Sequence, residues 1–188
     1  MFKNTLLFIF ELTKIIIISL IIIIPIRYFL IQPFYVKGAS MEPNFHNNEY
    51  LIVDEISYRF NKPRRGDIVV FRYPKNPQEY FIKRLIGLPG ETIEIKDESV
   101  IIFNKDYPNG IKLKETYLEP NIKTYGFNKE KVILGEKEFF FLGDNRTASK
   151  DSRTFGPVNK DLIIGKVLLR GWPFNKLKLF KIQEYNYQ

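Results

Sequence analysis

The sequence contains no cysteine and only one histidine, His46. The absence of cysteine excludes disulfide bonds, thiol catalysis and cysteine-based metal sites together. A single histidine also leaves no His-rich metal site, and any Ser-His-Asp triad would have to use His46 itself. The chemistry of this chain must therefore be sought among hydroxyl, amine and carboxylate side chains.

Acidic residues are outnumbered: Lys and Arg total 29, Asp and Glu total 21, and the net charge is +8. Such an excess fits binding to nucleic acid, binding to anionic lipid, or a solubilising surface. The basic residues are scattered through apolar strand-like runs, apart from short clusters such as residues 62–65. This distribution argues against nucleic-acid binding and favours attraction to an anionic membrane surface.

Charges are almost missing from residues 6–31, which are apolar nearly throughout. About 20 such residues cross a bilayer, and residues 12–31 supply them if Lys14 and Arg27 extend toward the two interfaces. Basic residues on the two sides of the run nearly balance, so they leave the orientation of a span open.

A cleavable signal peptide is the competing interpretation of this run, because its uncharged core is short. A cut after Ala39 would place Lys37 at the third position before the cut, which makes a poor small-x-small cleavage site. We therefore predict an uncleaved membrane anchor over residues 1–32.

Beyond Pro33 the pattern changes to short β-rich runs separated by Gly, Pro and Asn. Regularly spaced short strands with turn residues between them predict a mainly β fold, an all-β barrel or sandwich. The expected strands are residues 50–53, 67–72, 80–86, 92–95, 100–103, 131–134, 138–142 and 162–169. The predicted units are a main β domain of residues 33–91 and 138–180, an inserted small β lobe of residues 92–137, and a C-terminal tail of residues 181–188.

Ser40 is the first candidate for chemistry, because it follows Gly38 and Ala39 in a turn whose small residues let another chain approach. A turn serine that caps local amides is the alternative. A serine hydroxyl is a poor nucleophile until a base takes its proton. His46 lies in a polar stretch typical of a solvated loop, so we interpret it as a surface residue.

A lysine can serve as that base if burial favours its neutral amine. Strand alternation places Lys83 on one face with Phe81 and Leu85, so its amine is expected between apolar neighbours. The alternative is an exposed lysine whose stem covers Phe81. Arg84 then points to the other face, where we expect it to be structural or solvent-facing.

A dense polar segment, residues 141–153, follows an apolar run and contains two Asp, two Arg, one Asn and two Ser. Such a segment is typical of a buried polar network or of a calcium-type loop. The two interleaved arginines argue against a cation, so we predict a network.

Four segments, residues 40–45, 66–74, 80–91 and 143–158, resemble in order and type the conserved boxes of the type I signal peptidases, after an N-terminal anchor of the kind they share. The similarity extends over residues 34–173, apart from the inserted lobe. The resemblance implies a signal-peptidase-like β-barrel catalytic domain on one transmembrane helix. It also implies a membrane-bound serine endopeptidase that cuts signal peptides from exported preproteins after small residues (Ala-x-Ala).

By the same resemblance, Ser40 is the nucleophile, Lys83 is the general base, and the Ser149 hydroxyl orients the lysine amine. The implied supporting ion-pair network consists of Asp144, Arg146, Asp151 and Arg153. The implied lining of the substrate pockets consists of Phe34, Val36, Val70 and Ile82.

Two positions depart from the family pattern. Asn44 stands where the family usually has threonine, beside the nucleophile. Gly38 stands where some members have a serine whose hydroxyl helps to bind the oxyanion. The Ser40 amide remains as one donor, and the second must be water or another backbone group.

The expected partners are preproteins with signal peptides and the lipid bilayer, with no nucleic acid, metal or organic cofactor. The resemblance places the chain in the cell membrane as a single-pass protein with an extracytoplasmic catalytic domain. A self-cleaving Ser/Lys repressor-type protease is one alternative, opposed by the anchor and by the lack of a DNA-binding segment before Ser40. The other is a catalytically silent membrane-bound binding domain, opposed by the presence of both Ser40 and Lys83.

Overall fold

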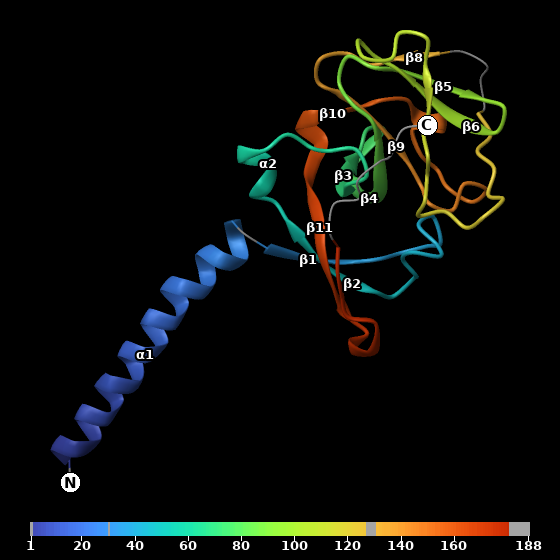
Figure 1. Cartoon of the computed structure of the whole chain (residues 1–188). Coiled ribbons are helices and arrows are strands. Elements are labelled where there is room, and N and C mark those ends of the chain that lie inside the picture. The colour runs from blue at the N-terminus through green and yellow to red at the C-terminus, as the bar shows by residue number, and fades with distance from the viewer. Residues whose placement is uncertain (1, 30, 127–130, 181–188) are drawn as a thin grey trace.

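The computed structural model describes residues 2–29, 31–126 and 131–180 of the 188-residue chain. A long N-terminal helix extends away from a body built mostly of strands (Figure 1). The predicted C-terminal tail of residues 181–188 lies outside the described residues. The mainly β fold with one N-terminal apolar helix is confirmed.

Helix α1, Phe2–Phe29, contains a window, Leu7–Ile24, that is long and apolar enough to cross a membrane and is not covered by the rest of the protein. The chain then enters strand β1, Ile31–Tyr35. The helix therefore ends short of Ile31, the last residue of the predicted span 12–31, and the bounds of the span itself stay a prediction. Pro33 is the physical reason for the end of the helix, because it lacks an N–H and disfavours helical geometry in the residue before it.

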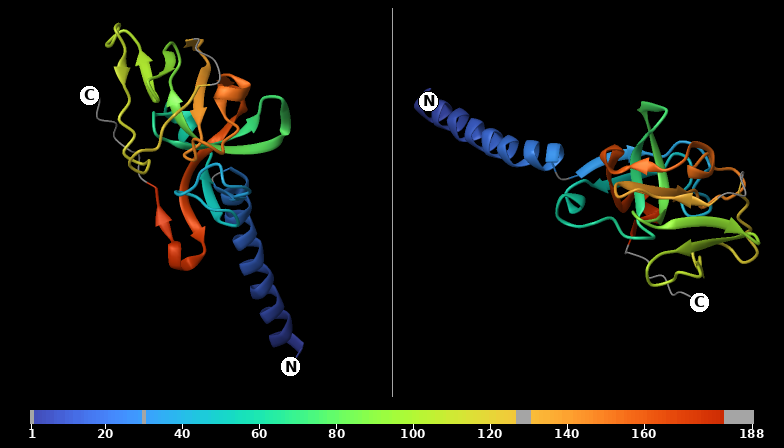
Figure 2. Two further views of the ribbon diagram at one scale, coloured as in Figure 1. Left: turned by 90° about the vertical axis from the view of Figure 1, so that its right-hand side faces the viewer. Right: turned by 90° about the horizontal axis from the view of Figure 1, so that it is seen from above.

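The larger sheet is antiparallel throughout and carries the order β1-β2-β11-β3-β4-β9-β10, with β12 paired to β11. Two views show it as a strongly twisted sheet (Figure 2). Its further strands are β2 Tyr50–Asp54, β3 Ile68–Tyr73, β4 Asn76–Gly87, β9 Glu138–Leu142, β10 Val158–Asn159, β11 Ile163–Trp172 and β12 Lys178–Leu179. Strand β4 pairs with β3 along one edge and with β9 along the other, and the side chains on both of its faces are buried near its C-terminal end.

A second sheet has the order β7-β6-β5-β8. Its strands are β5 Thr92–Lys96, β6 Ser99–Phe103, β7 Ile111–Lys112 and β8 Val132–Ile133. Ile93 and Ile102 of this sheet share a buried core with Ile86 and Phe140 of the larger one. The division into a catalytic domain and an inserted lobe stays a prediction.

Most of the shortest elements escaped sequence analysis, although β8 lies within the predicted strand of residues 131–134. Strands β1, β7, β10 and β12 were not predicted, nor were the one-turn helices α2, Ser57–Phe60, and α3, Ser152–Phe155. The 3₁₀ turns η1, Lys160–Leu162, and η2, Phe174–Lys176, were missed as well. The two- to four-residue elements among them are too short to display a hydrophobic period, so tertiary pairing decides them.

Candidate active site

The turn that carries Ser40 is anchored on both sides. Gly38 has a φ of +89°, a left-handed conformation that favours glycine. After the serine, the Met41 and Phe45 side chains are buried in the core, and the Phe45 N–H donates to the Met41 carbonyl at 2.9 Å. Ser40 itself is half-buried and faces a groove. The sequence thus folds into a turn that presents one hydroxyl at the groove, while the side chains that follow it are held in the hydrophobic core.

Lys83 reaches this hydroxyl from the middle of β4. Its side chain is 3% exposed, and its Nζ lies 2.7 Å from Ser40 Oγ and donates to the Ile82 carbonyl at 2.8 Å. Burial lowers the pKa of Lys83 to about 8, although the charges of Asp151 and Asp144 oppose this decrease. An amine with this pKa beside a hydroxyl can accept the hydroxyl proton near neutral pH.

Residues just after β9 hold the backbone of the Ser40 turn. The Asn145 N–H donates to the Ser40 carbonyl at 3.1 Å, and the Asn145 side chain donates to the Ala39 carbonyl at 3.1 Å. Gly143 packs so tightly that a Cβ there would collide with Ser149 Oγ and the Ser40 carbonyl. Only glycine allows this close approach, so the loop after β9 determines where the nucleophile lies.

Ser149 lies against this glycine, but its hydroxyl is buried without a hydrogen-bond partner in the described part of the chain. The bond to the lysine amine that the resemblance implied is not formed here. Lys83 Nζ instead contacts Ser40 Oγ and the Ile82 carbonyl. The orienting role of Ser149 stays a prediction.

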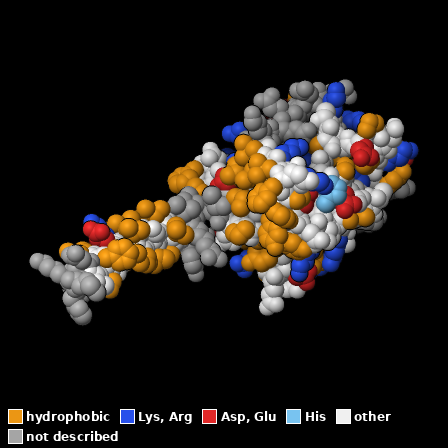
Figure 3. Space-filling model, turned by 90° about the horizontal axis from the view of Figure 1, so that it is seen from below, with side chains coloured by type: hydrophobic (Ala, Val, Ile, Leu, Met, Phe, Trp, Pro, Cys, Tyr) orange, Lys and Arg blue, Asp and Glu red, His pale blue; other side chains and the backbone are white. Residues whose placement is uncertain are grey.

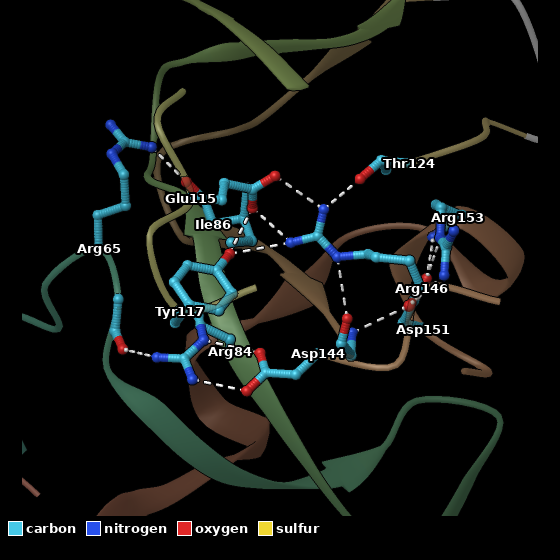
Figure 4. Close-up of polar contacts among 12 residues, drawn as sticks. Arg65, Arg84, Ile86, Glu115, Tyr117, Thr124, Asp144, Arg146, Asp151 and Arg153 are labelled. Atoms are coloured by element: carbon cyan, nitrogen blue, oxygen red, sulfur yellow. Dashed lines mark hydrogen bonds and ion pairs between the residues drawn. The ribbon is translucent and has the colours of Figure 1, made fainter. Parts of the chain in front are cut away.

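Asp144 forms its ion pair with Arg84, and the two side chains are shown in Figure 4. Arg84 Nε donates to Oδ1 at 2.8 Å and its terminal nitrogen donates to Oδ2 at 2.6 Å, in a bidentate pair. Arg84 is opposite Leu142 in the β4–β9 register, and this pairing brings the guanidinium beside the residue that follows Gly143. Arg84 is thus a buried structural residue.

The two arginines of the predicted network, Arg146 and Arg153, have separate partners (Figure 4). Arg153 and Asp151 pair with each other through two bonds of 2.8 Å. Arg146 pairs with Glu115 and donates to the Gly143 carbonyl at 3.0 Å. Glu115 was missed because it lies in a polar loop far away in sequence with no motif around it.

The groove beside Ser40 has a volume of about 640 Å³. Phe34 and Ile82, two of the four predicted pocket residues, line it. Val36 and Val70 do not: they are 4% and 2% exposed and lie in the hydrophobic core, against which Phe34 and Ile82 pack from the groove side. Both valines are thus enclosed by that core, and their assignment to the substrate pockets stays a prediction.

His46 does not line the groove. It is partly exposed, and its Nδ1 lies 3.5 Å from a carboxylate oxygen of the buried Glu49. Among the described residues, no group of three or more His, Asp or Glu side chains is arranged to hold a metal ion.

Comparison with known proteins adds an independent line. The family model described as "Signal peptidase, peptidase S26" matches residues 9–172. A signal peptidase I from Leptolyngbya laminosa is 41% identical over 85% of this chain and 78% of its own length, and a signal peptidase IB from Staphylococcus aureus is 34% identical over 86% and 88%. A crystal structure of a signal peptidase I from Enterococcus faecalis aligns with a TM-score of 0.46 at 36% identity, covering 56% of this chain and 97% of that one.

Proposed function

Because this chain belongs to the signal peptidase family S26, we propose that it cuts signal peptides with Ser40 as nucleophile and Lys83 as general base. The chain is a serine protease, a type I signal peptidase that removes signal peptides. The observation that carries the residue assignment is the 2.7 Å contact between Lys83 Nζ and Ser40 Oγ in a buried setting.

In the proposed reaction, neutral Lys83 takes the Ser40 proton while Oγ bonds to the scissile carbonyl carbon. The carbonyl oxygen becomes an oxyanion, and the Ser40 N–H is its proposed donor. The Lys83 ammonium then protonates the leaving amine as the C–N bond breaks, leaving an acyl-enzyme. Water then attacks this ester and gives a proton to Lys83. The ester bond breaks, the signal peptide leaves with a free carboxyl end, and the proton returns from Lys83 to Ser40.

The second oxyanion donor is not Gly38. This residue has no hydroxyl, and its N–H already donates to Asn47 Oδ1 at 2.9 Å. A water molecule or another backbone N–H is therefore the proposed second donor, in place of the serine hydroxyl that some family members have here.

The proposed substrates are preproteins with small side chains one and three positions before the cut. Next to Ser40 the groove is lined by Ala39 and Ala148 and by the apolar faces of Phe34 and Ile82. A shallow apolar surface of this kind favours small apolar side chains, because a larger one would stay partly in water.

The proposed location is the cell membrane, with α1 spanning the bilayer and the β domain on the extracytoplasmic side. Hydrophobic side chains gather along the helix and on the neighbouring face of the β domain (Figure 3). Trp172, Phe174, Leu177 and Leu179, around η2 and β12, are all exposed. Exposed aromatic and aliphatic side chains near an apolar helix support a β domain that lies at the bilayer surface.

Family membership opposes the self-cleaving repressor-type alternative, and one assay tests the catalytically silent one. The purified full chain in detergent is incubated with a model preprotein whose signal peptide ends in Ala-x-Ala, and the products are sized by mass spectrometry. The wild type should release the mature protein with or without EDTA, and Ser40→Ala should release none. An active Ser40→Ala variant, or activity that EDTA removes and a metal restores, contradicts this mechanism.

A further inference from the structure

The side chain of Asn44 joins three segments that are far apart in the sequence. Its Nδ2 donates to Asp144 Oδ2 at 2.9 Å and to the Tyr117 carbonyl at 3.1 Å. Asn44 belongs to the turn that carries Ser40, Asp144 follows β9, and Tyr117 lies after β7. One amide group therefore connects the nucleophile turn to both the loop after β9 and the segment between β7 and β8.

The carboxylate that accepts from Asn44 is itself held rigidly. Asp144 is 0% exposed and forms its bidentate pair with Arg84. Arg84 follows Lys83 on β4, with its side chain on the opposite face. A shift of Asp144 would therefore disturb the strand that carries the base, and a shift of Asn44 would disturb the turn that carries the nucleophile.

The second acceptor is equally fixed. The Tyr117 ring lies over the Arg84 guanidinium, with 3.8 Å between Cζ and the ring centroid. The Tyr117 hydroxyl contacts Glu115 and accepts from Arg146 at 2.9 Å (Figure 4). Both oxygens that face the Asn44 amide thus belong to groups whose positions other contacts determine.

We propose that Asn44 is a positioning residue of this protease, whose amide holds the Ser40 turn in register with Lys83 through Asp144 and Tyr117. The proposal rests on the assignment of Ser40 and Lys83 made above. A serine and its base must stay within hydrogen-bond reach for proton transfer, and a displacement of about 1 Å can lower a rate about a hundredfold. Asn44 does not contact the substrate groove, so its effect falls on kcat and not on KM.

Asn44→Thr and Asn44→Val form a matched pair that tests this role. The two side chains have nearly the same shape, but only the threonine hydroxyl can donate to Asp144. We expect kcat of Asn44→Thr to remain within about threefold of the wild type, and kcat of Asn44→Val to fall about tenfold or more, with KM of both within about twofold. Rates are taken per active site from the acyl-enzyme burst, so that loss of folded protein does not count.

Equal kcat values for the threonine and valine variants overturn the proposal, as does a valine variant that raises KM with kcat unchanged. If Asn44→Val melts below the assay temperature, Asn44→Ser and Asn44→Ala provide the same comparison with smaller side chains. Ser40→Ala is assayed alongside. An active Ser40→Ala contradicts the proposed function, whereas an inactive Ser40→Ala with equal threonine and valine rates contradicts only the positioning role.

Discussion

The two faces of strand β4 each bury one basic side chain, but they surround it with different neighbours. Lys83 and Arg84 are neighbours, 3% and 4% exposed. On one face, Arg84 has a carboxylate at 2.6 Å and an aromatic ring over its guanidinium. On the other, the Lys83 amine contacts a hydroxyl and a backbone carbonyl, both uncharged, with the Phe81 ring 5.2 Å away.

The difference shows that burial alone does not determine what a basic residue does. Arg84 keeps its charge, because a guanidinium does not lose its proton in proteins and because Asp144 compensates it directly. Burial lowers the pKa of Lys83 to about 8, because the loss of water outweighs the opposing charges of Asp151 and Asp144, and no carboxylate among the described residues forms an ion pair with its amine. One face therefore holds the structure together, and the other supplies an amine that can act as a base.

The largest expected effect comes from removing the amine on the groove face. Lys83→Met should lower preprotein cleavage by about a thousandfold or more, because Ser40 then has no base. The same variant should melt at a higher temperature than the wild type below pH 8, since a buried ammonium no longer has to be accommodated. Relative to an unfolded-state pKa of about 10.5, this gain should shrink between about pH 8 and 10.5 and vanish above that range.

Cleavage assays and melting curves at pH 6, 8 and 10.5 measure both parts. A Lys83→Met variant that cleaves at the wild-type rate removes Lys83 from the mechanism. One that melts lower than the wild type at pH 6 contradicts the cost assigned to its burial.

Removing the arginine from the opposite face should have a large effect on stability. Arg84→Met leaves the fully buried Asp144 carboxylate without its ion pair, which costs about 3–5 kcal/mol of folding free energy. Denaturant unfolding of the wild type, Arg84→Met and Arg84→Met/Asp144→Asn measures it. The double variant should recover part of the loss, and an Arg84→Met variant as stable as the wild type would make the two faces equivalent.

The pH profile sharpens the comparison without changing the chain. Only the neutral amine accepts the Ser40 proton, so kcat/KM should rise about tenfold per pH unit below about pH 8 and level off above it. Between pH 6 and 9 the expected rise is about a hundredfold. Activity that is constant from pH 5.5 to 9 contradicts a mechanism in which Lys83 must lose its proton before it can act as the base.

A smaller effect is expected at Gly38, on the groove side of Ser40. Nothing lies within 4 Å of a Cβ placed there, so Gly38→Ala should cost only the strain of φ +89°, about 1 kcal/mol. Gly38→Ser carries the same strain, and any benefit of its hydroxyl to the oxyanion should appear in kcat. We would compare kcat, KM and melting temperature of the two variants. Equal kcat values mean that a hydroxyl at position 38 does not reach the oxyanion.

The smallest effect is expected at His46, away from both faces of β4. His46→Ala should change the activation free energy of cleavage and the free energy of unfolding each by no more than about 0.5 kcal/mol, as for other surface substitutions. The assays are those used for Lys83→Met. An inactive His46→Ala variant beside an active Lys83→Met variant would transfer the role of base to histidine.

Local sequence patterns predicted several features of the candidate site. Strand alternation predicted that Lys83 and Arg84 face opposite sides, and small residues in a turn singled out Ser40. Both inferences depend only on neighbours in the chain, whose spacing a strand or turn makes nearly invariant. The same reasoning missed β1, because its first residue, Ile31, still belongs to the apolar run, and the next two, Gln32 and Pro33, do not continue a strand pattern.

Contacts between distant segments did not follow from local patterns. The polar loop after β9 was expected to form ion pairs, but Arg84 and Glu115 were not identified as the partners of Asp144 and Arg146. Each of these pairs depends on a strand register or loop path set far from its members, and no spacing in the sequence encodes it.

By itself, the sequence determined the apolar N-terminal helix, the mainly β character of the rest and the candidate residues Ser40 and Lys83. These follow from composition and from periods of a few residues. The tertiary structure decided which cation is compensated and which is not, that Val36 and Val70 belong to the core, and that Asn44 contacts Asp144. The physical reason is that a pKa, a buried charge and a hydrogen bond depend on which groups lie within a few ångströms in space, and only the folded chain brings these groups together.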